Sequence, residues 1–199
     1  DTHTAVAPTQ YLIPFKVKAP TGESRRAAFQ IVDRPSGTPL NSEPAILATS
    51  ANSQRLPVVA GGADGRFFSA WVDDSLANQA PEDGGEITLR VAEVGTTNSI
   101  AVSPPGASEI SAVRLLRGAS SLMVAWSEKR NNARRVMLAH VSPIAPFNVI
   151  DTNVVSSSTI LRTSSVNITE DTSGTVVAWN SSEYNNSRDV IAKRIPFNA

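Results

Sequence analysis

The segments Gly65-Arg-Phe-Phe-Ser-Ala-Trp71, Ser120-Ser-Leu-Met-Val-Ala-Trp126 and Gly174-Thr-Val-Val-Ala-Trp179 share one pattern, a largely apolar run closed by tryptophan. They contain all three tryptophans of the chain, and positions 71, 126 and 179 are separated by 55 and 53 residues. Strand segments that recur at a fixed period of about 40 to 55 residues are typical of propeller blades. The tryptophans are expected to pack between neighbouring sheets, where a large ring fills the wedge.

The same order of strands recurs around each tryptophan. Val, Ile and Thr dominate the apolar segments, Pro and Gly interrupt the chain at short intervals, and no long stretch has helical periodicity. Four strands are expected around each of the first two tryptophans, at 56–60, 66–73, 86–94 and 98–103, and at 110–116, 122–127, 135–141 and 148–155. Three are expected around the last, at 162–168, 175–180 and 189–195. The N-terminal stretch fits the second, third and fourth places of a further unit, at 11–18, 26–33 and 45–49.

The sequence therefore predicts an all-β, propeller-like fold of about four repeated four-stranded antiparallel blades. The expected units are residues 10–50, 55–104, 109–156 and 161–199, in a single domain over 1–199. Both end units look incomplete, and an unpaired strand edge favours association. Either the N-terminal strand closes the last blade, or a protein partner or second chain completes the propeller. The alternative fold is a pair of β-sandwich domains, which also have short strands and frequent turns.

The run of apolar residues closed by Ala-Trp, as in Leu122-Met-Val-Ala-Trp126, resembles the repeats of secreted bacterial β-propeller proteins. More loosely, it is similar to the sialidase-like propeller superfold. The resemblance covers residues 55–199 well and 10–50 loosely. The Asp-box turn of sialidase blades, Ser-x-Asp-x-Gly-x-x-Trp, does not occur here, so the resemblance places no catalytic residue.

Composition excludes several classes of function. The 18 Lys and Arg balance 18 Asp and Glu, so the chain has no general attraction for nucleic acid. Cysteine is absent, which excludes disulfides and thiolate chemistry, and no apolar run approaches the roughly 18 residues of a membrane span. The polar start, Asp1-Thr-His-Thr-Ala5, resembles a processed terminus. We therefore expect a secreted, periplasmic or cell-surface protein.

The loop after Trp71 is acidic. Its carboxylates offer the hard oxygen ligands that calcium prefers, and Asp73, Asp74 and Asp83 form a calcium-site hypothesis. Their spacing matches no EF-hand loop, and a solvated acidic loop is the alternative. Calcium is the one cofactor that the sequence leaves open.

The loop after Trp126 is basic. Lys129, Arg130, Arg134 and Arg135 form a hypothetical anion-binding set, or else are solvated or pair with the acidic loop of the neighbouring unit. In the third repeat the equivalent loop is rich in Asn, and Tyr184 is its one candidate for stacking against a sugar. Of the two histidines, His3 lies near the terminus and His140 is expected to face solvent at the matching place of a third strand.

The sequence contains no cofactor motif and no recognisable catalytic constellation. The leading expectation is therefore a protein that is not an enzyme: an exported binding or scaffold subunit presenting variable loops on a repeated β-scaffold. The alternative is a carbohydrate-active hydrolase of the sialidase type, or a lectin with carbohydrate as its partner. A hydrolase would need a pair of carboxylates whose separation the sequence does not give.

Overall fold

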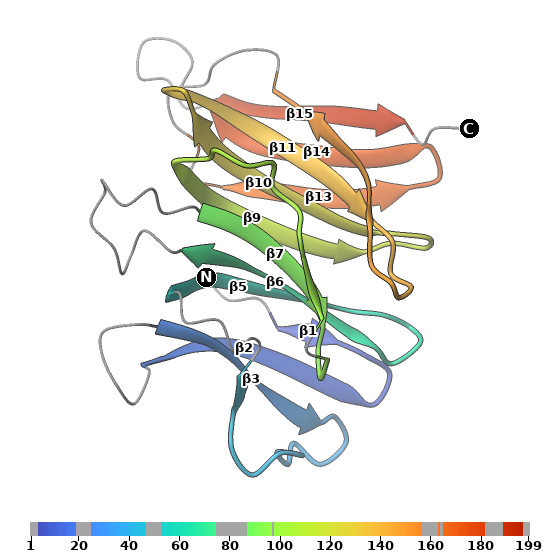
Figure 1. Ribbon diagram of the computed structural model, residues 1–199. Coiled ribbons are helices and arrows are strands. Elements are labelled where there is room, and N and C mark those ends of the chain that lie inside the picture. Colours follow the sequence, from blue (N-terminus) through green and yellow to red (C-terminus); the bar gives the residue numbers. More distant parts are fainter. Residues whose placement is uncertain are drawn as a thin grey trace. The chain divides into compact units, whose positions relative to one another are not determined.

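The computed structural model describes residues 4–18, 25–46, 53–74, 87–96, 98–156, 163, 165–181 and 189–196 (Figure 1). Within these ranges all the regular structure is β-strand, arranged as four antiparallel sheets. Three sheets have four strands and one has three, and in every sheet the strands pair in chain order. The chain divides into two compact units, residues 1–105 and 106–199, with two sheets in each.

The first unit contains the sheets β1–β4 and β5–β8. Their strands are β1 (Ala5–Val6), β2 (Gln10–Lys18), β3 (Arg25–Asp33), β4 (Ala45–Ile46), β5 (Ser53–Gly61), β6 (Phe67–Asp74), β7 (Ile87–Glu93) and β8 (Ser99–Ala101). Leu12 and Phe29 of the first sheet pack with Phe67 and Trp71 of the second in one apolar cluster. All eight residues of β6 are buried, as expected for a central strand with apolar residues on both faces.

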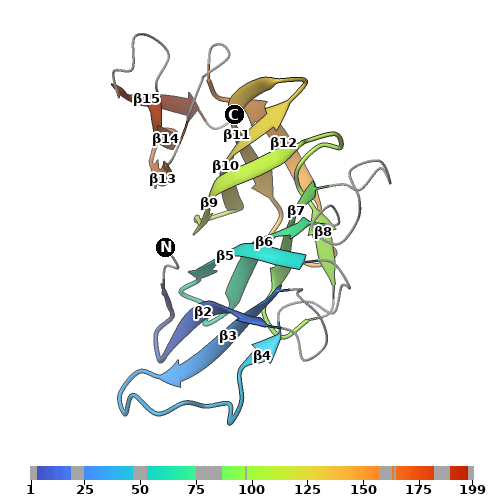
Figure 2. The same ribbon diagram turned by 90° about the vertical axis from the view of Figure 1, so that its left-hand side faces the viewer.

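The second unit contains the sheets β9–β12 and β13–β15, which face each other in Figure 2. Their strands are β9 (Glu109–Arg117), β10 (Leu122–Arg130), β11 (Ala133–Val141), β12 (Val149–Val154), β13 (Val166–Asp171), β14 (Gly174–Ser181) and β15 (Asp189–Pro196). Met123 and Leu138 of one sheet pack with Val177 and Trp179 of the other. The expected packing of Trp71 and Trp179 between neighbouring sheets is thus confirmed, and Trp126 is also fully buried.

The predicted all-β fold with about four repeated antiparallel sheets is confirmed. The third and fourth sheets lie within the regions expected for their repeats, whereas the first and second sheets begin at Ala5 and Ser53, before the expected residues 10 and 55. One detail was wrong. The N-terminal sheet has a strand in the first place, because Ala5 and Val6 pair with Leu12 and Tyr11 of β2. A strand of two residues is too short to show a pattern in the sequence. That the four sheets form one domain stays a prediction.

The basic segment after Trp126 is also not the loop that the sequence suggested. Strands β10 and β11 continue through it and pair up to Arg130 and Ala133, leaving Asn131 and Asn132 as the turn. Both asparagines have positive φ angles, of 48° and 60°. Two such residues form the type I′ turn whose twist matches that of the flanking strands, and asparagine tolerates this conformation. No helix of the described chain is long and apolar enough to span a membrane.

Candidate functional site

Two of the three tryptophans are followed, two residues later on the same strand, by a buried carboxylate. Asp73 follows Trp71 on β6, and Glu128 follows Trp126 on β10. Because side chains alternate along a strand, each carboxylate shares a face of its sheet with the preceding tryptophan. Asp73 is 4 % exposed and Glu128 is 1 % exposed. Buried carboxylates are costly unless they are paired, so their presence at equivalent positions requires an explanation.

Glu128 is held by two N–H donors on its own strand. The indole Nε1 of Trp126 donates to Oε2 at 3.0 Å, and Nε of Arg130 lies 3.1 Å from Oε1. Both oxygens of the carboxylate are thereby fixed in direction. The three residues occupy alternate positions 126, 128 and 130, so a single strand orients the whole group.

Asp73 and Asp74 are paired with arginines on the two strands beside β6. Oδ2 of Asp73 lies 3.3 Å from Nε of Arg90 on β7, and Oδ2 of Asp74 lies 2.7 Å from Nε of Arg55 on β5. As adjacent residues of a strand, the two aspartates lie on opposite faces of the sheet. Both are buried, at 4 % and 6 % exposure.

A strained bulge accompanies the carboxylate in each of these two sheets. The pairing of β5 with β6 shifts between Arg55 and Val58, opposite Trp71, and Leu56 there has a φ of 53°. The pairing of β9 with β10 shifts between Ala125 and Ser127, beside Trp126, and Ala112 on the facing strand has a φ of 51°. Residues other than glycine rarely adopt this conformation, which costs about 1–3 kcal/mol and is concentrated at functional sites.

The last sheet lacks both features. Ser181 takes the place two residues after Trp179, and β13 pairs with β14 without a shift from Val166–Trp179 to Asp171–Gly174. Among the described residues, a strained bulge and a buried carboxylate thus occur together in the sheets β5–β8 and β9–β12, and both are absent from the sheet β13–β15. Because bulges re-aim side chains beside active sites, we take the end of β6 in the first unit and the end of β10 in the second unit as two candidate sites, each described by itself.

The calcium hypothesis rested on three aspartates. Asp73 and Asp74 are engaged by Arg90 and Arg55, and Asp83 lies outside the described residues. Over the described parts of the chain, no group of three or more His, Asp or Glu side chains is placed to hold a metal ion. The aspartates are therefore better described as ion-paired strand residues, and calcium binding stays a prediction.

The predicted basic set is divided by the β10–β11 hairpin. Arg130 pairs with Glu128, while Nη2 of Arg134 lies 2.6 Å from Oε2 of Glu109 on β9. Lys129 and Arg135 are half-buried on the same two strands. Two of the four cations thus pair with acidic residues of their own sheet, a pairing that the sequence did not suggest, and anion binding by this set stays a prediction. Tyr184 lies outside the described residues.

His140 does not face solvent as expected. Its side chain is only 12 % exposed, and Nδ1 lies 2.8 Å from Oδ1 of Asp151 while Nε2 lies 3.2 Å from Oγ1 of Thr175. Comparison with Glu93 and Arg194 at equivalent places suggested an outward-facing position. That reasoning fails because Asp151 is the register partner of His140 on β12, and β14 packs against the same sheet.

The sequence did not single out Glu128 as a site residue. A signal was present: in the frames Trp71-Val-Asp73 and Trp126-Ser-Glu128, a carboxylate follows each apolar strand at the same place. The bulges at Leu56 and Ala112 left no signal, because neither residue is glycine or asparagine.

No protein-family model matches the chain, and no curated protein matches it in sequence. Solved structures do resemble it. A thermostable family-43 glycoside hydrolase matches with a TM-score of 0.59 at 13 % identity, over 98 % of this chain and 70 % of its own. An endo-arabinase from Bacteroides thetaiotaomicron matches with a TM-score of 0.53 at 12 % identity, over 98 % and 74 %. An α-L-arabinofuranosidase from Lactobacillus brevis matches with a TM-score of 0.53 at 13 % identity, over 95 % and 70 %.

These relationships establish the fold: the similar structures are β-propellers, as the repeats predicted. They also correct the expectation that the protein is not an enzyme. The absence of a recognisable catalytic motif suggested a scaffold, but the propellers that the chain resembles are glycoside hydrolases. Such enzymes use carboxyl groups that the fold brings together in space, so their sites leave no contiguous motif.

Proposed function

We propose that the protein is a glycoside hydrolase and that each of the buried carboxylates Asp73, Asp74 and Glu128 is a candidate for one of its reacting carboxyl groups. Hydrolysis of a glycosidic bond requires a carboxylic acid and a carboxylate, and it needs no cofactor. The observation that carries the proposal is the coincidence of a buried carboxylate with a strained bulge in two equivalent sheets. The likeness of the fold to family-43 enzymes supports it.

The surroundings of Glu128 suit a catalytic group. Its two oxygens are held by Trp126 and Arg130, so the carboxylate needs little reorganisation before it acts on a substrate. Asp73 and Asp74 are each fixed by an arginine on a neighbouring strand. Rigid strands place such groups more precisely than loops do.

The substrate we propose is a neutral oligosaccharide or polysaccharide. Two of the similar structures are named as an arabinase and an arabinofuranosidase, so arabinan and its oligosaccharides are the first substrates to test. The described cations beside these buried carboxylates, Arg55, Arg90 and Arg130, are each paired with a carboxylate. Such pairing leaves little net positive charge to attract an anionic sugar.

The test is release of reducing ends from arabinan and arabino-oligosaccharides by the purified chain. We expect hydrolysis, and we expect at least one of Glu128→Gln, Asp73→Asn and Asp74→Asn to lower kcat by about 10²–10⁴-fold, the usual contribution of acid–base catalysis. The matched control is Glu109→Gln in the same sheet as Glu128. Glu109 is half exposed and paired with Arg134, so its substitution should leave kcat nearly unchanged.

Circular dichroism and thermal melting show whether each variant is folded. The proposal fails if the wild-type chain does not hydrolyse these sugars, or if all three folded carboxylate variants retain wild-type kcat.

A further inference from the structure

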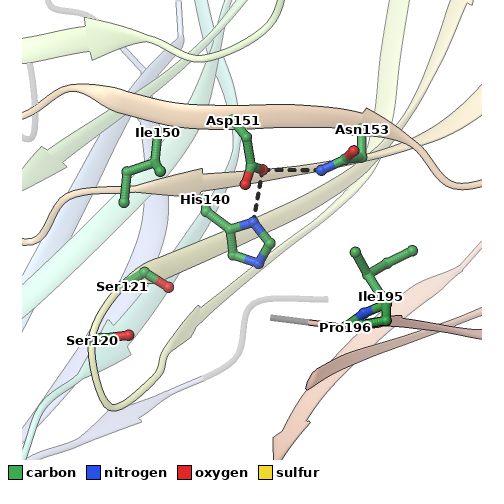
Figure 3. A pocket seen from close by; sticks show the side chains of 8 residues that line it. All are labelled: Ser120, Ser121, His140, Ile150, Asp151, Asn153, Ile195 and Pro196. Carbon is green, nitrogen blue, oxygen red and sulfur yellow. Dashed lines mark hydrogen bonds and ion pairs between the residues drawn. The ribbon is translucent and has the colours of Figure 1, made fainter. Parts of the chain in front are cut away.

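A pocket of about 360 Å³ lies at the opposite end of β10 from Glu128. It is lined by the β9–β10 turn, by residues of β11 and β12 and by the end of β15, as Figure 3 shows. His140 is the register partner of Met123, five residues before Glu128 along β10. At about 3.4 Å per residue, the pocket is therefore some 17 Å from that carboxylate along the strand. Its volume lies at the lower end of the range for small-molecule sites, about 300–1,000 Å³.

The polar wall of the pocket is fixed before any ligand arrives. His140 is held at Nδ1 by Asp151 and at Nε2 by Thr175, whose hydroxyl in turn donates to Sδ of Met123 at 3.0 Å. Nδ2 of Asn153 donates to Oδ1 of Asp151 at 3.0 Å (Figure 3). A site whose groups are already ordered loses less conformational entropy when it binds.

The hydrogen-bonding groups of this wall that remain unused suit a ligand with hydroxyl groups. The bonds from His140 and Asn153 both end on Oδ1 of Asp151, so within the described residues Oδ2 is left as an acceptor. The side-chain amide oxygen of Asn153 is a second acceptor. The hydroxyls of Ser120 and Ser121 can both donate and accept. No Lys or Arg is among the described residues that line the pocket, so it offers no ammonium or guanidinium group to an anion.

The apolar wall is created by a second kind of bulge. The β11–β12 pairing skips from His140–Asp151 to Val141–Val149, which leaves Ile150 without a register partner. Ile150 lines the pocket beside Asp151, although adjacent residues of a regular strand would lie on opposite faces. Ile150 is 55 % exposed, so its apolar surface is accessible to a ligand. Ile195 and Pro196 of β15 form the facing apolar surface.

The turn that carries Ser120 and Ser121 is braced from two elements. Oε2 of Glu170 on β13 accepts a bond from the backbone N–H of Ala119 at 3.0 Å. Nη1 of Arg117 reaches the carbonyl of Ser121 at 3.4 Å. The serine hydroxyls are thus presented on a positioned turn.

We infer that this pocket is a second saccharide-binding site, separate from the buried carboxylate of Glu128. A carboxylate, an amide and hydroxyls match the hydroxyl groups of a sugar ring, and the Ile150, Ile195 and Pro196 surface matches its C–H faces. The inference rests on the proposed function only in one respect, the choice of a neutral sugar as the class of ligand. The site would hold the polymer to the protein away from Glu128.

The test is a titration of the ¹⁵N-labelled full chain with L-arabinose and with arabinotriose, followed by amide chemical shifts. We expect saturable shifts at Ser120, Ser121, Asp151 and Asn153. Galacturonic acid should give weaker shifts, because its carboxylate would meet that of Asp151. The shifts should be lost in Asn153→Ala and in Ile150→Ser.

Thr152→Ala is the matched control. Thr152 is exposed on the same strand, outside the pocket lining, and its variant should bind as the wild type does. Absence of shifts at the pocket amides up to the solubility limit of both sugars would overturn the inference, and so would shifts that persist in both pocket variants.

The two proposals fail separately. Hydrolysis that depends on Asp73, Asp74 or Glu128, without changes in the amide chemical shifts of the pocket, would support the hydrolase proposal and overturn the second saccharide site. Pocket shifts without hydrolysis leave the saccharide site and remove the hydrolase.

Discussion

The indole N–H of Trp126 donates to the carboxylate of Glu128 at 3.0 Å, two residues further along the same strand. This bond joins the residue that marks the repeat to a group proposed to do the chemistry. Trp179 fills the equivalent place in the last sheet, where Ser181 stands instead of the carboxylate and the indole Nε1 has no partner among the described residues.

The two tryptophans therefore provide a matched comparison. Phenylalanine at either position removes similar volume from a buried site, but only Trp126→Phe removes a donor from a buried carboxylate, because Oε2 of Glu128 loses its bond while Oε1 keeps Arg130. Leaving such a group unsatisfied costs about 1–3 kcal/mol. We expect Trp126→Phe to lower the free energy of unfolding by about that much more than Trp179→Phe, as measured by urea denaturation. Equal losses would show that the indole–carboxylate bond contributes little.

The strained backbone at Ala112 should lower the free energy of unfolding of the protein. Its φ of 51° favours glycine, so Ala112→Gly should raise the free energy of unfolding by about 0.5–1 kcal/mol, after the entropy of glycine is subtracted. Ala139→Gly is the control, because Ala139 pairs regularly within β11 and should lose about 1 kcal/mol. Two variants that lose stability equally would argue against strain at Ala112.

Backbone conformation also decides which residues are tolerated in the turn of the β10–β11 hairpin. Asn132 has a φ of 60°, which a β-branched residue tolerates poorly. Asn132→Val should lower the free energy of unfolding by about 1–2 kcal/mol, while Asn132→Gly should be neutral or stabilising. Thermal melting of the two variants measures the difference, and a valine variant as stable as the glycine variant would exclude the type I′ turn.

The Arg66–Glu93 pair should make stability depend on pH. The hydrogen bond from Arg66 holds the pKa of Glu93 below its ordinary value of 4.5. Nε and Nη2 of Arg66 lie 2.7 and 2.6 Å from the two carboxylate oxygens of Glu93. Because the pKa is depressed in the folded state, the stabilisation is complete above the unfolded pKa. It is lost as the pH falls through the folded pKa.

Glu93→Gln should therefore be less stable than the wild type at neutral pH, by about 0.2–1 kcal/mol for a partly exposed pair. The difference should shrink as the pH falls below about 4.5, when measured by urea denaturation at a series of pH values. A difference that stays constant down to acid pH would assign the effect to packing instead of charge.

The fold was predictable because its signals are local and repeated. Apolar runs ending at Trp71, Trp126 and Trp179 identified the central strands, and Gly and Pro marked the turns between strands. The short strand at Ala5–Val6 was missed, because two residues carry no periodicity. The hairpin at Asn131-Asn132 was read as a loop because its charged flanks, Glu128 to Arg135, hide the strand pairing.

The candidate site was much less predictable. The charge pattern of the sequence singled out Asp73 and Asp74, but as calcium ligands in a loop, and it did not indicate that they are buried. It did not single out Glu128 at all. Burial of Glu128 depends on the packing of a charged residue at the end of an apolar strand, which the sequence pattern treats as solvent-facing. The neighbourhood of His140 depends on the pairing of β11 with β12 and the packing of β14, contacts between residues distant in the chain.

The most direct test of the account is the rate at which the wild-type protein and its Glu128→Gln, Asp73→Asn, Asp74→Asn and Glu109→Gln variants release arabinose or arabino-oligosaccharides from arabinan. The account predicts hydrolysis by the wild type and by Glu109→Gln. It predicts a fall of about 10²–10⁴-fold in at least one of the three buried-carboxylate variants. A folded wild-type chain that releases no product, or three buried-carboxylate variants that match the wild type, would contradict it.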